Sequence, residues 1–209
     1  MSLRSLLLFF LFLSSLHADT LKERDETYSI RVGMGYADMN DLGQILSGSW
    51  ERYGDIYALN LDMGYRLIED LWDVPIDIYL KGGLSYFNEQ GYQDDFGEMN
   101  VYVKAYWKLD FWQNRVRIGF GEGLSLAQEI PYVETVDATN PDGSVDPTAK
   151  FLNYLDISLD FDLGRLVRYK PIYDLYLGYT LKHRSGIFGT FNGVHGGSNY
   201  NMFTIEKNF

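Results

Sequence analysis

Apolar and polar residues alternate over most of the chain, and this alternation most limits what the chain can fold into. In residues 28–36, every even position is aromatic or aliphatic and every odd position is small or polar. Successive side chains of a β-strand point to opposite faces, so the pattern predicts strands with one apolar face. Eight segments of this kind are found, at residues 28–36, 57–65, 76–86, 99–109, 116–120, 155–163, 173–185 and 201–209.

The charged residues of these segments fall on the face opposite the large apolar residues. A soluble eight-stranded barrel such as a lipocalin also alternates, but it would place its charges outside. A Lys or Arg that faces lipid costs about 2 to 4 kcal/mol at the bilayer midplane, so the segregation favours an all-β, eight-stranded antiparallel transmembrane β-barrel. The interior of such a barrel is filled by side chains. We therefore expect an ion-paired plug, and not a pore, built from Arg31, Arg66, Lys81, Lys104, Lys108, Arg117, Asp156, Asp160 and Asp162.

The N-terminus has the features of an export signal. Arg4 precedes an apolar run at residues 6–13, and Ala18 follows a short polar stretch. This order predicts a signal peptide at residues 1–18, cleaved after Ala18, which leaves a barrel domain at residues 19–209. The chain has no cysteine and a net charge of −11. That balance argues against a nucleic-acid partner, and no motif indicates a cofactor.

The connections between the predicted strands alternate in length, which orients the barrel. Short connections at residues 67–75, 110–114 and 164–171 alternate with longer ones at 38–54, 88–97, 126–149 and 186–198. In outer-membrane barrels the short turns are periplasmic and the long loops extracellular. The terminal Phe209 resembles the C-terminal signature of bacterial outer-membrane proteins. We therefore expect the outer membrane of a Gram-negative bacterium, and a barrel-assembly machinery that binds the strand ending in Phe209.

Acidic residues in the long connections allow two interpretations. They could hold a divalent cation beside lipopolysaccharide phosphates, or they could form a solvated acidic surface. No spacing matches a calcium-binding loop, so the sequence favours the solvated surface and no metal site; the residues concerned are Asp94, Asp95, Glu98, Glu129, Glu134 and Asp137. Glu122 is a separate case because it has the apolar parity of its strand. A bulge at Gly121 and Gly123 would turn it inward, and two strands away from His183 it is a poor third member of a catalytic set.

The predicted strand 173–185 ends in two residues that can carry out chemistry. His183 and Ser185 continue the parity of its apolar face. Side chains two apart on a strand face the same way, with Cβ atoms about 6 to 7 Å apart. Ten residues span about 33 Å of strand, or roughly 23 Å of depth at a tilt near 45°, so this pair is expected at the outer rim of the apolar band. A serine and a histidine placed in this way can act as nucleophile and general base.

At this point the chain resembles the outer-membrane lipid A 3-O-deacylases, eight-stranded barrels related to acyloxyacyl hydrolases. Their penultimate strand carries a lipid-facing His-x-Ser, which His183 and Ser185 match, and the signal, loop pattern and final Phe agree over the mature chain. In that family the serine attacks a lipid ester, the histidine activates the serine and a glutamate orients the histidine. Here the orienting position best matches Asn199, and Gly186 stands where the family usually has asparagine.

The resemblance implies an outer-membrane serine esterase that hydrolyses an acyl ester of lipid A. In that interpretation Ser185 is the nucleophile, His183 the base and Asn199 the orienting residue. Donors near Gly186, Asn192 and Gly193 would stabilise the oxyanion. The substrate and partner would be lipopolysaccharide in the outer-membrane lipid. The alternative is a non-enzymatic small barrel that stabilises the membrane or binds a partner through its loops.

Overall fold

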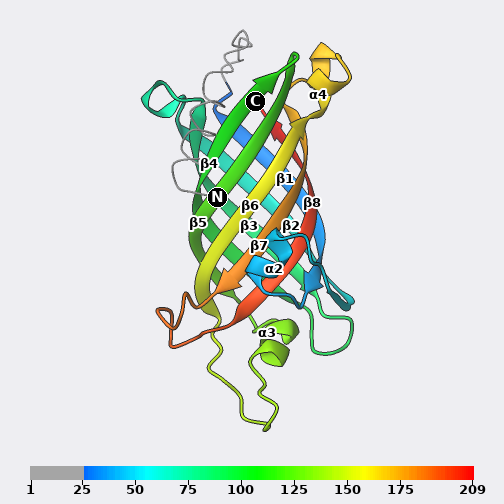
Figure 1. Cartoon of the computed structure of the whole chain (residues 1–209), viewed down its shortest axis with the longest axis vertical. Coiled ribbons are helices and arrows are strands. Elements are labelled where there is room, and N and C mark those ends of the chain that lie inside the picture. The colour runs from blue at the N-terminus through cyan, green and yellow to red at the C-terminus, as the bar shows by residue number, and fades with distance from the viewer. Residues whose placement is uncertain (1–25) are drawn as a thin grey trace.

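The computed structural model describes residues 26–209, so the expected signal peptide at residues 1–18 lies outside the described part. The chain forms one closed antiparallel barrel in which each strand pairs with its neighbours in sequence and the last pairs with the first (Figure 1). The strands are β1 Tyr28–Asp38, β2 Arg52–Ile68, β3 Ile76–Asn88, β4 Phe96–Phe111, β5 Asn114–Ala127, β6 Phe151–Asp162, β7 Leu175–Ser185 and β8 Gly197–Asn208.

The predicted fold class and all eight strands are confirmed, and the differences lie at strand ends. The predicted strand at 173–185 starts two residues early, because Tyr173 closes a short 3-10 turn, η2 Lys170–Ile172, and Asp174 has a left-handed φ of 63°. Residue 163 belongs to the short helix α4 Leu163–Leu166 and not to β6. At the other end β8 begins at Gly197, so Asn199 lies within the sheet and not beside a loop.

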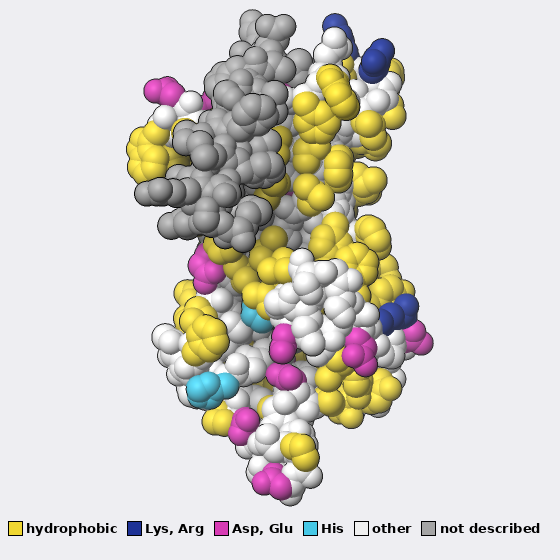
Figure 2. All heavy atoms as spheres, in the orientation of Figure 1, with side chains coloured by type: hydrophobic (Ala, Val, Ile, Leu, Met, Phe, Trp, Pro, Cys, Tyr) yellow, Lys and Arg dark blue, Asp and Glu magenta, His cyan; other side chains and the backbone are white. Residues whose placement is uncertain are grey.

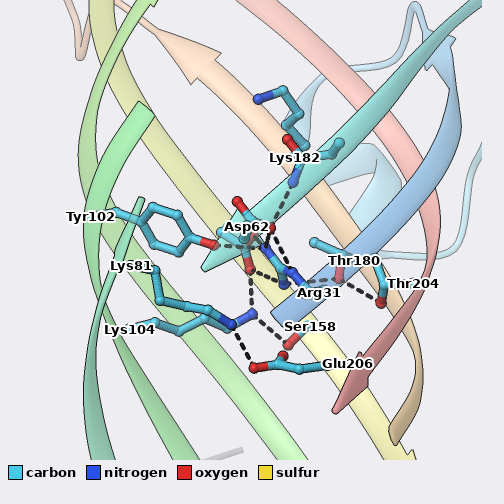
Figure 3. A network of polar contacts seen from close by, with 12 residues as sticks. Arg31, Asp62, Lys81, Tyr102, Lys104, Ser158, Thr180, Lys182, Thr204 and Glu206 are labelled. Atoms are coloured by element: carbon cyan, nitrogen blue, oxygen red, sulfur yellow. Dashed lines mark hydrogen bonds and ion pairs between the residues drawn. The ribbon is translucent and has the colours of Figure 1, made fainter. Parts of the chain in front are cut away.

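The lumen is the ion-paired plug that the charge pattern predicts. Arg31 donates to Asp62 at 2.8 Å and also pairs with Asp156. Lys81 donates to Glu206 at 2.6 Å. These side chains are all buried and come from β1, β2, β3, β6 and β8, so the pairs tie opposite walls of the barrel together (Figure 3).

Large apolar side chains cover the outside of the barrel and remain exposed, as Figure 2 shows for one face. Examples from six strands are Val32, Leu61, Leu84, Val103, Phe120 and Leu159. A soluble protein does not expose such a continuous belt, so this outer surface is the one that a lipid bilayer covers. Within residues 26–209, no helix is long and apolar enough to span a membrane.

The two ends of the barrel differ as expected from the connection lengths. The short turns, which include the 3-10 turn η1 Leu71–Asp73, lie at the end that carries the C-terminus (Figure 1). There Phe209 and Tyr28 exchange backbone hydrogen bonds of 2.9 and 3.0 Å, which close the seam between the first and last strands. The long loops lie at the opposite end, with the helices α2 Leu42–Leu46 and α3 Tyr132–Asp137.

The expectation that the acidic loop residues are all solvated is wrong for two of them. Glu98 and Glu134 are 2% and 3% exposed. Glu98 accepts from Lys182 and lies 3.3 Å from Arg184. Glu134 lies 3.2 Å from Arg184 and accepts from Ser198 at 2.7 Å. Both carboxylates therefore neutralise cationic side chains of β7 that point into the barrel at its long-loop end. The sequence does not show these contacts, because the paired residues are far apart along the chain.

Candidate functional site

Five residues of β5, β6, β7, β8 and β1 form one row across the outer face of the barrel near its long-loop end. Cross-strand pairing places Glu122 opposite Leu155, Leu155 opposite His183, His183 opposite Asn199, and Asn199 opposite Asp38. Directly opposed residues of neighbouring strands lie about 5 Å apart. Polar side chains distant in sequence are therefore gathered where the apolar belt ends.

His183 and Asn199 are in direct contact within this row. His183 Nδ1 lies 2.7 Å from Asn199 Oδ1, and Asn199 Nδ2 donates to the backbone carbonyl of Asn40 at 2.9 Å. Because the amide nitrogen of Asn199 faces a carbonyl, its oxygen must face the histidine. The Nδ1 of His183 then carries the proton, which leaves Nε2 as the basic nitrogen.

The segment 38–51 between β1 and β2, here called the α2 segment, covers part of the outer face of β7 and β8. Asp38 anchors it by accepting from the backbone N–H groups of Asn40 at 2.8 Å and Glu51 at 3.1 Å. Further along, the ring of Trp50 stacks on Tyr179 with centroids 5.6 Å apart. The carbonyl that holds Asn199 is thus part of a fixed structure and not of a free loop.

A cavity of about 530 Å³ lies between the α2 segment and the outer faces of β5 to β8. His183, Ser185 and Asn199 all contribute to its wall, together with Phe120 and Leu155. The wall therefore carries a nucleophile and a base beside apolar side chains of the lipid-facing strands. Such a mixed lining suits a molecule with a polar head and an acyl chain.

Ser185 is half-buried in this wall. Its Oγ lies 3.4 Å from the backbone N–H of Ile187, and no hydrogen bond joins it to His183 among the contacts described for residues 26–209. Ile187 and Phe188 have left-handed φ angles of 44° and 52°, which non-glycine residues rarely adopt. This tight turn directs a backbone donor toward the serine oxygen, and such strain is often found at functional sites.

Of the three residues expected to stabilise an oxyanion, Gly186 and Gly193 have their backbone N–H groups engaged elsewhere, and Asn192 has its side-chain amide engaged. Gly186 N–H donates to the carbonyl of Gly196, and Gly193 N–H donates to that of Gly189, both at 3.2 Å. Asn192 Nδ2 donates to the carbonyl of Phe151 at 3.1 Å. None of the three is among the residues that line the cavity.

No bulge turns Glu122 inward. The pairing of β5 with β4 and β6 runs without a shift through this point. Gly121 and Gly123 instead leave space for Tyr102 of β4, whose atoms a Cβ would meet at 2.9 Å and 2.5 Å. Glu122 therefore stays outward and exposed in the cavity wall, where it accepts from Asn153, the cross-strand partner of Ser185.

Sequence reasoning missed several residues of this site. Asp38, Asn40, Asn153 and His195 all line the cavity, although none has a motif around it. Strand register alone places Asn153 opposite Ser185 and Asp38 opposite Asn199. Asn153 lies two positions before Leu155 and therefore on the same face of its strand. This spacing was the one indication in the sequence that Asn153 faces outward.

Neither a protein family nor a curated protein sequence matches the chain. Among solved structures, the crystal structure of the outer membrane enzyme PagL is similar with a TM-score of 0.55 and 10% sequence identity, covering 87% of this chain and 99% of that one. Neisserial surface protein A (NspA) is similar with a TM-score of 0.46 and 12% identity, covering 87% of this chain and 97% of that one. At such identities the likeness to PagL concerns the fold: this chain is an eight-stranded barrel of the kind found in outer-membrane proteins.

Proposed function

We propose that the protein is a lipid esterase of the outer membrane that removes an acyl chain from lipid A. The observation that carries the proposal is the contact of His183 with Asn199 in the cavity that also exposes Ser185. This cavity opens on the lipid-facing side of the barrel, where an ester at the border of headgroup and acyl chain would lie. The likeness to PagL, described as an outer membrane enzyme, agrees with it at the level of the fold.

The proposed reaction uses Ser185 as nucleophile. In this reaction Nε2 of His183 takes the proton of the Ser185 hydroxyl as Oγ attacks the ester carbonyl, a step that requires the hydroxyl to turn from Ile187 toward the histidine. The bond between that carbon and the sugar oxygen then breaks, and His183 passes its proton to the leaving oxygen. Water hydrolyses the acyl-enzyme in a second step with His183 again as base, and a fatty acid leaves.

Asn199 orients the histidine but supplies no negative charge to the imidazolium. An amide in this position supports catalysis in papain-like proteases, where the third residue is also asparagine. The Asn40 carbonyl fixes the direction of the amide, so His183 is held in one tautomer. The expected result is a working but slower enzyme than one with a carboxylate in this position.

The backbone N–H of Ile187 is the donor best placed for the oxyanion, because it already lies beside Ser185 Oγ. Gly186 and Gly193 would add donors only after the loop 186–196 rearranges on substrate binding, since their backbone N–H groups are engaged, and so would the side-chain amide of Asn192. Each such donor contributes a factor of about 10² to 10³ in rate.

The same proposal includes the cellular location. The predicted export signal, the apolar belt and Phe209 at the closing seam together favour the outer membrane of a Gram-negative bacterium, with assembly through the machinery that recognises the last strand. Cell fractionation tests this proposal, since the mature chain should sediment with the outer membrane. Recovery in the periplasm would contradict it.

Mass spectrometry of lipid A from cells with and without the protein tests the activity. The parent should release one fatty acid per lipid A, while Ser185→Ala and His183→Ala should release none although both barrels remain resistant to SDS until heated. The double variant should be no worse than either single one, because the two residues act as one unit. Release by the Ser185→Ala protein would move the active site elsewhere. No release by the parent from several lipopolysaccharide types would favour the non-enzymatic barrel.

A further inference from the structure

Asn153 of β6 is held beside the proposed nucleophile with its amide in one direction. It pairs across the strands with Ser185, lines the same cavity and is 5% exposed. Its Nδ2 donates to the carboxylate of Glu122 and to the carbonyl of Gly123, the latter at 3.0 Å. A carbonyl and an ionised carboxylate can only accept, so they take both hydrogens of the amide and fix which end is the nitrogen.

The Oδ1 of Asn153 is therefore an acceptor that faces the site. Glu122 and Gly123 both belong to β5, so the amide nitrogen faces β5 and the oxygen faces away from it, toward the side on which β7 carries Ser185. Among the contacts described for residues 26–209, no donor reaches this oxygen. A nearly buried acceptor is unfavourable without a donor, so this oxygen suits a molecule that enters the cavity and brings a hydrogen.

Three side chains surround one small space in this part of the cavity. Directly opposed residues have Cβ atoms about 5 Å apart, and diagonal neighbours about 7 to 8 Å. Ser185 is opposed to Asn153, and His183 is the diagonal neighbour of Asn153. Because Nδ1 of His183 faces Asn199 on β8, its Nε2 faces away from β8 and toward β6. A molecule of the size of water can therefore contact this Nε2, the Oδ1 of Asn153 and an acyl group on Ser185 together.

The groups around Ser185 differ in the charge that they favour. The backbone N–H of Ile187 lies beside Oγ and would stabilise the negative oxygen of the tetrahedral intermediate. The Oδ1 of Asn153, with the Glu122 carboxylate bonded to the other end of its amide, would repel such an oxygen and attract a group that donates a hydrogen. The water that attacks in the second half of the reaction is a group of this kind, and it must also reach His183.

We infer that Asn153 positions the water that hydrolyses the acyl-enzyme, and that Glu122 acts through Asn153 by holding its amide in this direction. The inference rests on the proposed esterase function and adds two residues to it. The water donates one hydrogen bond to Oδ1 and passes its other proton to Nε2 of His183 while its oxygen attacks the acyl carbon. The bond from that carbon to Ser185 Oγ then breaks, Oγ takes the proton from His183, and the fatty acid leaves.

The test compares two nucleophiles that attack the same acyl-enzyme. Full-length protein in detergent micelles receives lipid A and a fixed concentration of hydroxylamine, a stronger nucleophile that depends less on positioning. Mass spectrometry measures the fatty acid formed by water and the hydroxamic acid formed by hydroxylamine, and Ser185→Ala gives the background without enzyme. In Asn153→Ala the ratio of hydroxamic acid to fatty acid should rise about tenfold, because the water has lost its acceptor. This ratio does not depend on which step limits turnover.

Two changes at Glu122 separate its charge from its hydrogen bond. Glu122→Ala alters an exposed side chain and should raise the ratio in the same direction as Asn153→Ala. Glu122→Gln should raise it less, because glutamine still accepts from the Asn153 amide. Asn88→Ala is the matched control, since Asn88 also donates to a carboxylate, that of Asp95 at 3.0 Å, but lies outside the cavity lining. Its ratio should equal that of the parent.

An unchanged ratio in both Asn153→Ala and Glu122→Ala would overturn the inference, because a change that only disturbs Ser185 slows both nucleophiles equally. The heat-dependent shift of the band in SDS shows that each barrel has assembled. The parent protein separates this result from failure of the proposed function. A parent that forms neither product contradicts the esterase, whereas a parent that forms both, with an unchanged ratio in the two variants, keeps the esterase and removes Asn153 from the reaction.

Discussion

At the scale of single residues, Asn199 joins the catalytic pair to the rest of the fold. Its oxygen contacts His183 and its nitrogen is bound by Asn40. We predict that Asn199→Leu, similar in size but without hydrogen bonds, lowers the rate of ester hydrolysis by about 10² to 10³, within the range for loss of histidine orientation. Asn199→Asp should hold or raise the rate, because a carboxylate still accepts from the histidine and adds the negative charge that stabilises the imidazolium.

The measurement is fatty-acid release from purified lipid A, with the shift of the band on heating in SDS as a control for folding. Equal rates for the parent and the Asn199→Leu protein would show that the histidine needs no orienting partner, and would remove Asn199 from the site.

The candidate site was predictable in part from the sequence. Parity alone places His183 and Ser185 on the lipid-facing side, and the parity of the last strand puts Asn199 on the same face. The contributions of Asp38 and Asn40 were not predictable. They depend on the closure of β1 against β8 and on the backbone path of the α2 segment, and neither is set by a local pattern.

At the scale of elements, the α2 segment acts as a support for the site. Asp38 holds it through two backbone N–H groups and through Asn201 Nδ2 at 2.6 Å. We predict that Asp38→Ala lowers hydrolysis about tenfold while the barrel still assembles, because the Asn40 carbonyl is no longer fixed. Asp55→Ala is the matched control, since Asp55 is exposed and contacts only Arg52 among the ion pairs described. Equal loss in both variants would argue against a supporting role.

The helix α3 should respond to pH through two buried carboxyls outside the strands. Burial raises the pKa of Glu89 to about 7 and that of Glu134 to about 6. Glu89 accepts from the backbone N–H of Tyr132 at 3.2 Å, so it ties the loop after β3 to the start of α3. A carboxyl whose pKa is raised in the docked state binds its proton more tightly there. Docking of α3 is therefore strongest below about pH 4.5 and weakens as the pH rises through 6 to 7.

Hydrogen exchange of residues 128–150, corrected for the intrinsic dependence of exchange on pH, checks this prediction. Protection should be greater at pH 5.5 than at pH 8, by up to about tenfold for each unit by which a pKa is raised. In the Glu89→Gln protein, residues 128–150 should remain protected at pH 8, and their protection should depend less on pH than it does in the parent. A parent with equal protection at both values would mean that these carboxyls do not titrate in this range.

At the scale of the whole molecule, the number of strands and their inward and outward faces could be predicted because both follow from a period of two residues. In a membrane-spanning barrel, one face of every strand meets lipid and the other meets the polar interior. Apolar and polar residues therefore alternate even in segments that are short or contain few large apolar residues. The boundaries were less predictable, since β5 continues through Gly119, Gly121 and Gly123, which carry no side chain to show the alternation. The covering of β7 and β8 by the α2 segment was not predictable, because a loop leaves no periodic signal.

The membrane-spanning barrel predicts a cost for charge that depends on depth along one strand. Val103 lies at the middle of β4 and Phe111 at its short-turn end, and both are exposed on the outer face, at 47% and 44%. Val103→Arg should destabilise the folded barrel by about 2 to 4 kcal/mol, because the guanidinium would face the hydrocarbon centre, whereas Phe111→Arg at the interface should cost about 0 to 1 kcal/mol for its charge. Reversible urea unfolding in lipid vesicles measures both. The same small effect at the two positions would mean that water and not lipid surrounds β4, which would contradict the membrane-spanning barrel.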